Sequence, residues 1–464
     1  MSLLNELRVT LGGEGLRLPG DGLDRYVREP RGRFHGEPLA VARPASTDEL
    51  AEIVRLCAAH RQTMVPQGGL TGLVGGGSAR GGELVISLER MRAIRNLDVA
   101  DASVVVEAGC SLAALRQAAA DAGLIYPVSL ASEGTATIGG TLATNAGGNL
   151  TIRHGNTRAQ VLGLEVVLAD GQVLSELSPL RKNNTGFELN QLMVGSEGTL
   201  GIISAAALKL APAPRQSNTA LLAMDSLTAG LDLLRRLRAE LGETLSACEF
   251  MPRLAMDFVL ADQSDQADPF DQPHAWYLLV QADSSLAGDD LRRSLEAMLA
   301  RALAAGFMED AVIAKNMDQA GRLWRLREGI SAAQKHGGVS LKHDISVPIS
   351  RIPEFIKRTL PALQEAVPGI RPCIFGHLGD GNLHFNLSQP SDMAAGDFRA
   401  LEPDCNRIVF NAVRAVNGSI AAEHGVGQLR RAELAAGQPL KVELMKRIKL
   451  ALDPHGLLNP GKLV

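Results

Sequence analysis

The glycines of this 464-residue chain are concentrated in two runs. Eight of the fifteen residues from Gly68 to Gly82 are glycine, and a second glycine-rich run spans residues 127–149. Glycine costs conformational entropy, so dense runs are favoured where the backbone adopts positive φ or approaches a ligand closely. A fold for this chain must therefore give these two segments a task that side chains cannot perform.

The first run predicts a cradle for phosphate. It follows a short predicted strand, its successive N–H groups can form a nest for anionic oxygens, and Thr71 adds a hydroxyl donor. A pyrophosphate is the natural ligand; a flexible surface loop is the alternative, and the second run favours the ligand. The chain contains no G-x-G-x-x-G and no Walker A sequence, so a dinucleotide would bind in another way than in Rossmann or P-loop proteins.

Strands and helices alternate around the glycine runs, and the pattern changes after about residue 216. Residues 46–49, S-T-D-E, form a capping box ahead of an amphipathic helix, and Asp170-Gly171 predicts a hairpin turn. Pro212 and Pro214 mark a domain boundary. We predict strands at 63–66, 83–88, 103–107, 161–168, 172–174, 198–210 and 276–281. We predict further helices at 111–124, 227–241, 289–305 and 352–367.

Composition and charge exclude several classes of protein. With 47 basic and 51 acidic residues and only 3% aromatic residues, nucleic-acid binding is not expected. The five cysteines are far apart, which argues against a disulfide scaffold or a cysteine zinc site and fits a reducing compartment. No secretory signal pattern and no run of 18 apolar residues occurs. We therefore expect a cytoplasmic protein without a transmembrane segment, with attachment to the periphery of the inner membrane left open.

Histidines and carboxylates gather in the final quarter of the chain. The segment FGHLGDGNLHFN places His377 and His384 on either side of a Gly-Asp-Gly turn, and AEHGVG follows at residues 422–427. A tight turn could bring both imidazoles to one point. Two histidines and one carboxylate are a common ligand set for a divalent metal with open positions, and their net positive charge with the metal favours an anionic substrate. The alternative is a set of polar core histidines with ordinary hydrogen bonds.

Cations precede this region on a predicted helix and strand. In LWRLREGIS, Arg327 and Ser331 are four residues apart and share a helix face, and Lys342 lies in the predicted strand LKHDISVP. An arginine fork and a lysine suit a carboxylate, whereas the alternative is an ordinary solvated face.

The glycine runs also carry a family resemblance. PQGGLTGLVGG, PVSLASEGTATIGGTLATNAGGN and GSEGTLGIISAAALKL resemble the PCMH-type FAD-binding domain of the vanillyl-alcohol oxidase superfamily over residues 35–212. The resemblance implies two α/β subdomains, about 35–125 and 126–214, that enclose FAD. Many members tether the flavin through a histidine in the first loop, where this chain has Gln67 and Gly68, so the FAD is expected to be non-covalent. The implied FAD-binding residues are Pro66, Gln67, Gly68, Gly69, Leu70, Thr71, Gly72, Gly75, Ser129, Gly134, Thr137, Gly139, Gly140, Thr144, Asn145, Gly147, Gly148, Gly198, Ile203 and Asn459.

The later motifs resemble those of FAD-linked D-2-hydroxyacid dehydrogenases, a branch that includes D-2-hydroxyglutarate and D-lactate dehydrogenases. The resemblance implies that His377, His384 and Glu423 bind a divalent metal, zinc first and otherwise manganese, iron or cobalt. It also implies that His424 is the general base and binds substrate. The other implied substrate-binding residues are Arg327, Ser331, Lys342 and Asn386. Arg327, Ser331 and Lys342 fit the spacing of the D-2-hydroxyglutarate branch, with serine where threonine is usual, and a dicarboxylic substrate is therefore expected.

The resulting prediction is an α+β protein: an FAD-binding domain at 1–214, a substrate-binding cap domain with an antiparallel sheet at 215–425, and a helical segment at 426–464 that returns to the FAD domain. The expected reaction oxidises a D-2-hydroxyacid to its 2-oxoacid, with hydride transfer to flavin N5. The electron acceptor would be an electron-transfer flavoprotein, a quinone or a cytochrome, and a homodimer is expected. The alternatives are a D-lactate, D-malate or glycolate dehydrogenase or oxidase on the same fold, and a flavin-free subunit without activity.

Overall fold

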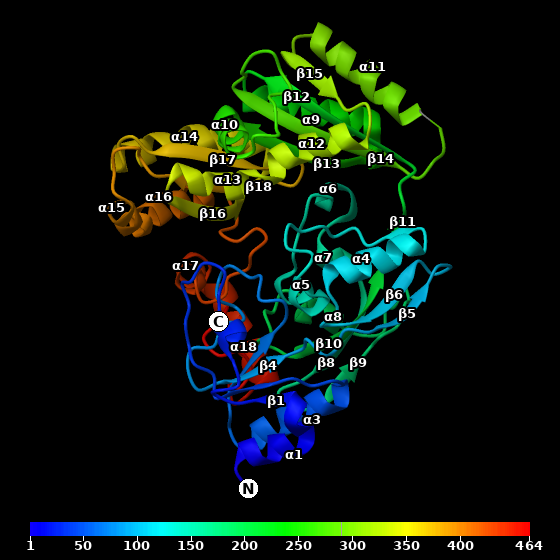
Figure 1. Cartoon of the computed structure of the whole chain (residues 1–464), viewed down its shortest axis with the longest axis vertical. Helices are drawn as coiled ribbons and strands as arrows, with labels where there is room; N and C mark the ends of the chain where they lie inside the picture. Colours follow the sequence, from blue (N-terminus) through cyan, green and yellow to red (C-terminus); the bar gives the residue numbers. More distant parts are fainter. Residues whose placement is uncertain (289) are drawn as a thin grey trace. The chain divides into compact units, whose positions relative to one another are not determined.

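The computed structural model describes residues 1–288 and 290–464, so the predicted helix start at Asp289 lies outside the described residues. The chain divides into two compact units (Figure 1). The first unit contains Met1–Gly148, Gly155–Ala213 and Glu423–Val464, and the second contains Asn149–His154 and Pro214–Ala422. The main crossing between the units therefore falls between Pro212 and Pro214, the two prolines that the sequence singles out.

One strand of the first sheet, β3, leads directly into the first glycine run, Gly68 to Gly82, which is called the glycine loop below. The strand order of this sheet is β1-β2-β4-β3, with β2, β4 and β3 parallel. The predicted helix is confirmed as α3 (Thr47–Ala59), which begins at Ser46, whose hydroxyl accepts from the N–H of Glu49 at 3.1 Å. Helix α1 (Leu3–Gly15) packs against α3. The strands are β1 (Leu16–Arg17), β2 (Ala40–Ala42), β3 (Met64–Gln67) and β4 (Leu84–Ser87).

The second sheet of this unit is antiparallel, with the order β5-β6-β10-β8-β9. The hairpin predicted at Asp170-Gly171 is confirmed, and Gly171 takes a φ of +82°, which favours glycine. The strands β5 and β6 precede residue 125 and pair within this sheet with strands that follow residue 160. The reason is that buried β10 needs a partner on each side and finds β6 on one and β8 on the other. The strands are β5 (Ile94–Asp98), β6 (Ser103–Glu107), β8 (Val161–Val167), β9 (Val173–Ser175) and β10 (Ile202–Lys209).

The end of the chain returns to the first unit, as expected. The N–H of Met64 donates to Leu457 O at 2.7 Å, and the N–H of Asn459 donates to Met64 O at 2.8 Å. The segment that follows the last helix is thereby fixed beside β3, the strand that leads into the glycine loop. The remaining elements of this unit are α2 (Asp24–Val27), α4 (Leu112–Asp121), β7 (Leu124–Ile125), α5 (Ile138–Thr144), α7 (Thr157–Gln160), α8 (Leu189–Met193), β11 (Ala211–Pro212), α17 (Arg431–Gly437) and α18 (Pro439–Leu452).

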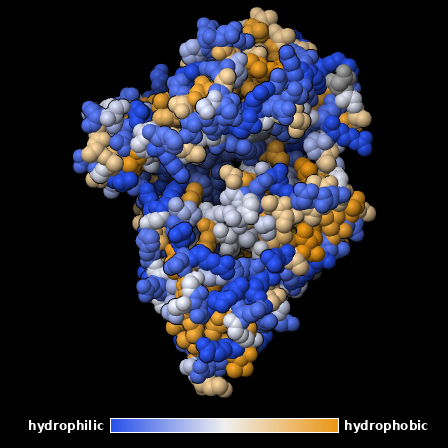
Figure 2. Space-filling model, viewed as in Figure 1, coloured by the Kyte–Doolittle hydropathy of each residue, from blue (hydrophilic) through white to orange (hydrophobic). Residues whose placement is uncertain are grey.

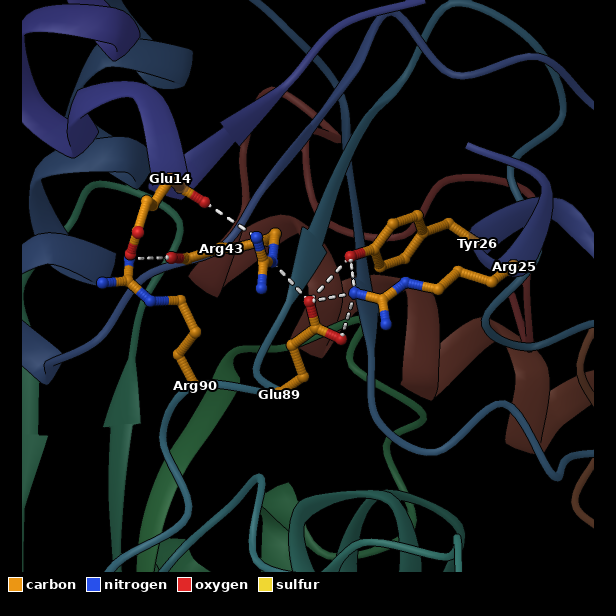
Figure 3. Close-up of polar contacts among 6 residues, drawn as sticks. All are labelled: Glu14, Arg25, Tyr26, Arg43, Glu89 and Arg90. Atoms are coloured by element: carbon orange, nitrogen blue, oxygen red, sulfur yellow. Dashed lines mark hydrogen bonds and ion pairs between the residues drawn. The ribbon is translucent and has the colours of Figure 1, made fainter. Parts of the chain in front are cut away.

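A network of charged side chains holds the segment around Tyr26, which contacts the residue directly before the glycine loop (Figure 3). The carboxylate of Glu89 accepts from Arg25, from Arg43 and from the hydroxyl of Tyr26, the last at 2.7 Å. The backbone carbonyl of Tyr26 in turn accepts from Nε2 of Gln67 at 2.8 Å. The network therefore positions Tyr26, and Tyr26 positions the residue that directly precedes the glycine loop.

The second unit is built on a seven-stranded antiparallel sheet (Figure 1). Its order is β15-β12-β14-β13-β17-β18-β16. The hydrophobic side chains of α9, α11, α14 and α16 cover one face, and those of α10, α12 and α13 cover part of the other. The strands are β12 (Gln216–Met224), β13 (Leu245–Pro252), β14 (Trp276–Ser284), β15 (Asp310–Ile313), β16 (Ser340–Ser346), β17 (Arg371–His377) and β18 (Asn382–Ser388). The helices are α6 (Thr151–His154), α9 (Leu227–Leu241), α10 (Arg253–Asp262), α11 (Asp290–Ala304), α12 (Met317–Glu328), α13 (Ile330–Ala333), α14 (Ile352–Ala366), α15 (Ala395–Ala400) and α16 (Glu402–Ala415).

Sequence periodicity identified some of these elements and missed others. The predicted helices at 227–241 and 352–367 and the strand at 276–281 are confirmed as α9, α14 and part of β14. The strands β12 and β13 were not predicted. Both are buried along nearly their whole length, so they lack the polar alternation that marks a strand with one solvated face.

The visible outer surface is mostly hydrophilic, as expected for a chain with 21% charged residues. Hydrophilic residues cover most of the face seen in Figure 2, and hydrophobic residues gather in separate patches, one of them around β5 and β6. Across the described ranges, no helix combines the length and the hydropathy that a bilayer crossing requires. All five cysteines are buried, and none of them forms a disulfide.

Candidate active site

The glycine loop presents unused backbone donors. Some of its carbonyls are occupied: Val74 O accepts from the N–H of Gln428 and Gly75 O from that of Ser78. In contrast, no hydrogen bond within residues 1–288 and 290–464 uses the N–H groups of residues 69–76. Buried or half-buried N–H groups are normally paired in a folded protein. The loop therefore has the donor set of an anion nest, which fits a pyrophosphate.

Close packing explains why the loop is glycine. A Cβ on Gly69 would lie 1.8 Å from the carbonyl oxygen of Thr135, and one on Gly68 would lie 2.3 Å from Oγ1 of Thr137. Thr137 is also the N-cap of α5, where its hydroxyl faces the N–H of Gly140. The two glycine runs thus pack directly against each other, which requires that neither carries side chains at the contact.

Together the two runs line one pocket of the first unit. Fifteen of the twenty expected FAD-binding residues contribute to its wall: Pro66, Gln67, Gly68, Gly69, Leu70, Thr71, Gly72, Gly75, Thr137, Gly139, Gly140, Thr144, Gly198, Ile203 and Asn459. The other five are Ser129, Gly134, Asn145, Gly147 and Gly148, and the structure does not place them in the wall. Two of these have structural tasks nearby, because Asn145 caps α5 in the left-handed conformation and Gly148 packs on Ser129 O.

Several groups in the wall fit a large polar cofactor. Oε1 of Gln67 and Oδ1 of Asn459 are buried without a hydrogen-bond partner in the described part of the chain. The imidazole of His424 also lies in the wall. Unpaired donors, unpaired acceptors and apolar side chains such as Leu130 in one pocket match FAD, which carries a pyrophosphate, a flavin edge with polar atoms and an apolar ring. The residues present therefore fit FAD.

Sequence analysis missed Glu197 in this wall. Its carboxylate accepts from the N–H groups of Val426 and Gly427, both at 2.8 Å, so it ties the segment after His424 to the pocket. Burial raises the pKa of Glu197 despite these two hydrogen bonds, which lower it. The signal was available, since Glu197 is the charged residue within the glycine-rich GSEG segment.

The second unit carries two histidines on one face of its sheet. The predicted turn is confirmed: β17 and β18 form a hairpin, and the rings of His377 and His384 lie 5.7 Å apart between centroids. Glu423 directly follows Ala422, the last residue of this unit, whose N–H donates to Asp344 O at 3.3 Å. Two imidazoles on this face, together with the carboxylate of the residue that follows the unit in sequence, make up a donor set of two nitrogens and one oxygen. This donor set fits a divalent metal such as zinc.

A buried glutamate adjoins the histidine pair. Glu249 on β13 lies directly opposite His377 in the ladder, and its Oε1 accepts from Nδ1 of His377 at 2.6 Å. Its Oε2 accepts from Nε of Arg327 at 3.0 Å. Burial would raise the pKa of Glu249, but the neighbouring His377 and Arg327 outweigh burial and lower it below its usual value. Sequence analysis missed this residue, although a lone glutamate in the apolar run LSACEFMP is a signal, because buried charges are paired.

The expected substrate-binding residues lie around this pair. Arg327 is buried and its guanidinium lies 4.9 Å from the centre of the Phe375 ring. Lys342 stands opposite Asn386 in the β16–β18 ladder, on the face that carries His384. Nζ of Lys342 donates to the backbone carbonyl of Ser331 at 3.4 Å. The face therefore combines two imidazoles with two cations, a set suited to an anionic substrate.

Two of the expected substrate-binding residues differ from the expectation: Asn386 is already hydrogen-bonded to another side chain, and Ser331 is exposed. The side-chain amide of Asn386 is buried and donates to Oε1 of Gln334 at 2.7 Å, so Gln334 orients it. Ser331 is exposed at the start of α13, after a break in the helix at Gly329. Arg327 and Ser331 therefore differ in burial although they are four residues apart.

Family models match most of the chain. Residues 38–175 match the FAD binding domain model, and residues 213–463 match the model described as FAD linked oxidases, C-terminal domain. A D-2-hydroxyglutarate dehydrogenase of Xanthomonas citri pv. viticola is 40% identical over 96% of this chain and 93% of its own length. The enzyme of that name from Stutzerimonas stutzeri is 35% identical over 100% and 98%, and the mitochondrial one of Bos taurus is 37% identical over 98% and 81%.

Solved structures show the same fold at low sequence identity. A substrate-bound p-cresol methylhydroxylase aligns with a TM-score of 0.78 at 16% identity, over 99% of this chain and 96% of its own. An alkyldihydroxyacetonephosphate synthase aligns with a TM-score of 0.73 at 16% identity, over 99% and 84%. The expected PCMH-type FAD-binding fold is thereby confirmed.

Proposed function

Because the chain belongs to the family of FAD-linked oxidases that includes D-2-hydroxyglutarate dehydrogenases, we propose that it oxidises D-2-hydroxyglutarate to the 2-oxoacid with FAD and a divalent metal. The observation that carries the choice of a dicarboxylate is the shared sheet face of the second unit, where Arg327 and Lys342 accompany His377 and His384. A metal-type donor set suits the C1 carboxylate and the 2-hydroxyl of the substrate. Two further cations suit a second carboxylate, which D-lactate lacks.

The chain's own residues supply binding and proton transfer. His377, His384 and Glu423 would hold the metal, and Arg327 and Lys342 would bind the distal carboxylate through charged hydrogen bonds. An imidazole nitrogen of His424 would accept the proton of the 2-hydroxyl oxygen as the C2 hydrogen leaves with its electron pair. When bound, FAD supplies the acceptor of that hydride, and a divalent cation supplies Lewis acidity at the 2-hydroxyl.

The remaining features of the proposal are the flavin linkage, the metal, the location, the oligomeric state and the electron acceptor. The FAD is non-covalent, because Gln67 already donates its Nε2 to the carbonyls of Tyr26 and Gly77 and is not a nucleophile. Zinc is the first choice of metal, with manganese, iron and cobalt as the others. We further propose a cytoplasmic homodimer that passes electrons to an electron-transfer flavoprotein, a quinone or a cytochrome.

A substrate panel tests the reaction most simply. Steady-state rates with D-2-hydroxyglutarate, D-malate and D-lactate, measured with an artificial acceptor dye, should give the highest kcat/KM with D-2-hydroxyglutarate. A preference for D-lactate would assign the chain to a monocarboxylate branch of the same fold. No turnover with any 2-hydroxyacid by a flavin-loaded sample would refute the proposed function.

Two cheaper measurements test the cofactors. A chelator should abolish turnover while the flavin absorbance persists, and added zinc should restore the turnover. Full activity of a metal-free sample would remove the metal from the proposal. Acid precipitation should leave the yellow colour in the supernatant, and colour that stays in the pellet would contradict non-covalent FAD.

A further inference from the structure

The buried carboxylate of Glu249 contacts two residues to which the proposed function gives different tasks. Its Oε1 accepts from Nδ1 of His377 at 2.6 Å, and its Oε2 lies 3.0 Å from Nε and 2.9 Å from Nη2 of Arg327. The side chain of Glu249 is only 1% exposed. All three residues belong to the second unit, so the contacts lie within one compact body.

The first contact fixes the histidine ring. With Nδ1–H donated to Glu249, the neutral imidazole of His377 keeps the lone pair of Nε2 for a metal. Carboxylates in this position orient metal-binding histidines and raise their basicity, and removing one typically costs 10–100-fold in metal affinity. The ladder keeps the pair in register, because Glu249 and His377 are directly opposed on β13 and β17.

The second contact fixes the arginine. Arg327 comes from α12, whereas Glu249 and His377 come from the sheet, so Glu249 joins the helix to the sheet at this point. The guanidinium also lies over the ring of Phe375, and that ring lies 5.0 Å from the ring of His384. With Nε and Nη2 held by Glu249, the Nη1 edge is the one left to meet a ligand.

We propose that Glu249 is a positioning residue that sets the tautomer of His377 and the spacing between the metal-binding histidines and Arg327. That spacing selects the length of dicarboxylate that the site accepts. The inference rests on the proposed function, because it assigns roles relative to that metal and that substrate. A buried ion pair that only stabilises the sheet would have neither effect.

The same unit offers a matched control. His274 is buried, and its Nδ1 lies 2.7 Å from Oε2 of Glu309, which is nearly the geometry of the pair formed by His377 and Glu249. His274 is not one of the histidines that the proposed function assigns to the metal. Glu309→Gln therefore changes a carboxylate–imidazole contact of similar length, although the Glu309 side chain is 46% exposed where that of Glu249 is buried.

Metal affinity is the first measurement. Wild-type holoenzyme, Glu249→Gln and Glu309→Gln are stripped of metal and titrated with zinc against a chromophoric chelator, with flavin absorbance and Tm recorded for each. We expect one tight site in the wild type, a Kd about 10–100-fold higher in Glu249→Gln, and a Kd within twofold of wild type in Glu309→Gln. Glu249→Asp, which keeps the charge but is one methylene shorter, should move in the same direction and covers the case in which Glu249→Gln does not fold.

Two outcomes of this titration separate the two claims. If the wild type binds no metal tightly, the metal part of the proposed function fails and the inference fails with it. If the wild type binds metal and the Glu249 variants bind it equally well, the inference alone fails. The visible spectrum of the cobalt-loaded proteins gives a second readout: it should change in Glu249→Gln and stay unchanged in Glu309→Gln, and an unchanged spectrum in Glu249→Gln would argue for a merely structural carboxylate.

Substrate discrimination at saturating metal is the second measurement. Glu249→Gln should raise the KM for D-2-hydroxyglutarate about tenfold or more and the KM for D-lactate much less, because only the dicarboxylate uses Arg327. Equal changes in both KM values would overturn the claim that Glu249 sets the spacing.

Discussion

The pocket of the first unit and the histidine-bearing sheet face of the second unit are built from different chemical groups. In the first unit the pocket wall is largely backbone: the N–H groups of residues 69–76 and glycines that pack against the second glycine run. In the second unit the site is made of charged side chains held by one another, with Glu249 at the centre. A backbone surface is sensitive to added atoms, whereas a side-chain surface is sensitive to lost or misdirected ones.

His424 departs most from this comparison, because its side chain has a proposed chemical role but lies in the wall of a pocket that is otherwise largely backbone. Its replacement is expected to have the largest effect. His424→Asn should lower kcat by about 10²–10⁴-fold, the usual contribution of a general base, while FAD stays bound. The readouts are turnover with D-2-hydroxyglutarate and the flavin absorbance of the purified variant. Unchanged turnover would remove His424 from the mechanism, and loss of the flavin would show that His424 holds the cofactor rather than accepting the proton.

Gly69 tests the backbone surface directly. A Cβ at this position meets the backbone of Thr135, which cannot move aside cheaply, so Gly69→Ala should bind FAD about 10–100-fold more weakly. Gly134→Ala is the control, because its Cβ would enter open space and Gly134 does not line the pocket. Fluorescence titration of both apoproteins with FAD measures the effect. Equal affinities would contradict the steric account of the loop.

Lys342 tests the side-chain surface. If Lys342 binds the distal carboxylate as proposed, Lys342→Met removes one charged hydrogen bond to it, so kcat/KM for D-2-hydroxyglutarate should fall about tenfold and that for D-lactate by less than about threefold. Lys357→Met on α14 changes an exposed lysine of the same unit and is the control. A uniform loss with both substrates would mean that Lys342 does not read the second carboxylate.

The smallest expected effect concerns Lys462 of the first unit and is a change in the pH dependence of stability. Its Nζ is buried without a partner among the described residues, and burial, the main cause, lowers its pKa from 10.5 to about 8. Between pH 8 and 10.5 the unfolded chain therefore binds the proton that the native state has lost. The free energy of unfolding should rise with pH across this window, and the cost of charging the buried amine is fully present below pH 8.

Lys462→Met removes that cost. The variant should have a higher Tm at pH 7, by about 2–4 °C for each 1 kcal/mol gained in a domain of this size. It should also lose the extra stabilisation that the wild type gains between pH 8 and 10. Thermal unfolding of both proteins at pH 7 to 10 measures this, and a variant that is less stable at pH 7 would show that the charged amine has a favourable partner.

The sequence predicted the two surfaces unequally. Glycine density revealed the backbone pocket, because only a demand for close approach explains such a run, and the Gly-Asp-Gly turn revealed the hairpin that pairs His377 with His384. Glu249 could not be found in this way. Its partners are 128 and 78 residues away, and their meeting depends on the register of β13 with β17 and on the position of α12.

The same limit explains the other differences. Asn145 and Gly148 belong to the second glycine run, yet the structure uses them for capping and packing beside the wall. The strands β5 and β6 join their sheet because β6 pairs with β10, a strand that lies far along the chain. Local pattern predicts which segments are special, whereas long-range register decides which atoms of those segments meet.

The most direct test of the central claim is the reductive half-reaction under anaerobic conditions. Purified, metal-replete protein is mixed with D-2-hydroxyglutarate without any acceptor, and the visible flavin band is followed in a stopped-flow instrument. The account predicts rapid bleaching with the D-isomer, little with the L-isomer, and none after the metal has been removed. A flavin that stays oxidised in the presence of the D-isomer, or a preparation that carries no flavin, would contradict it.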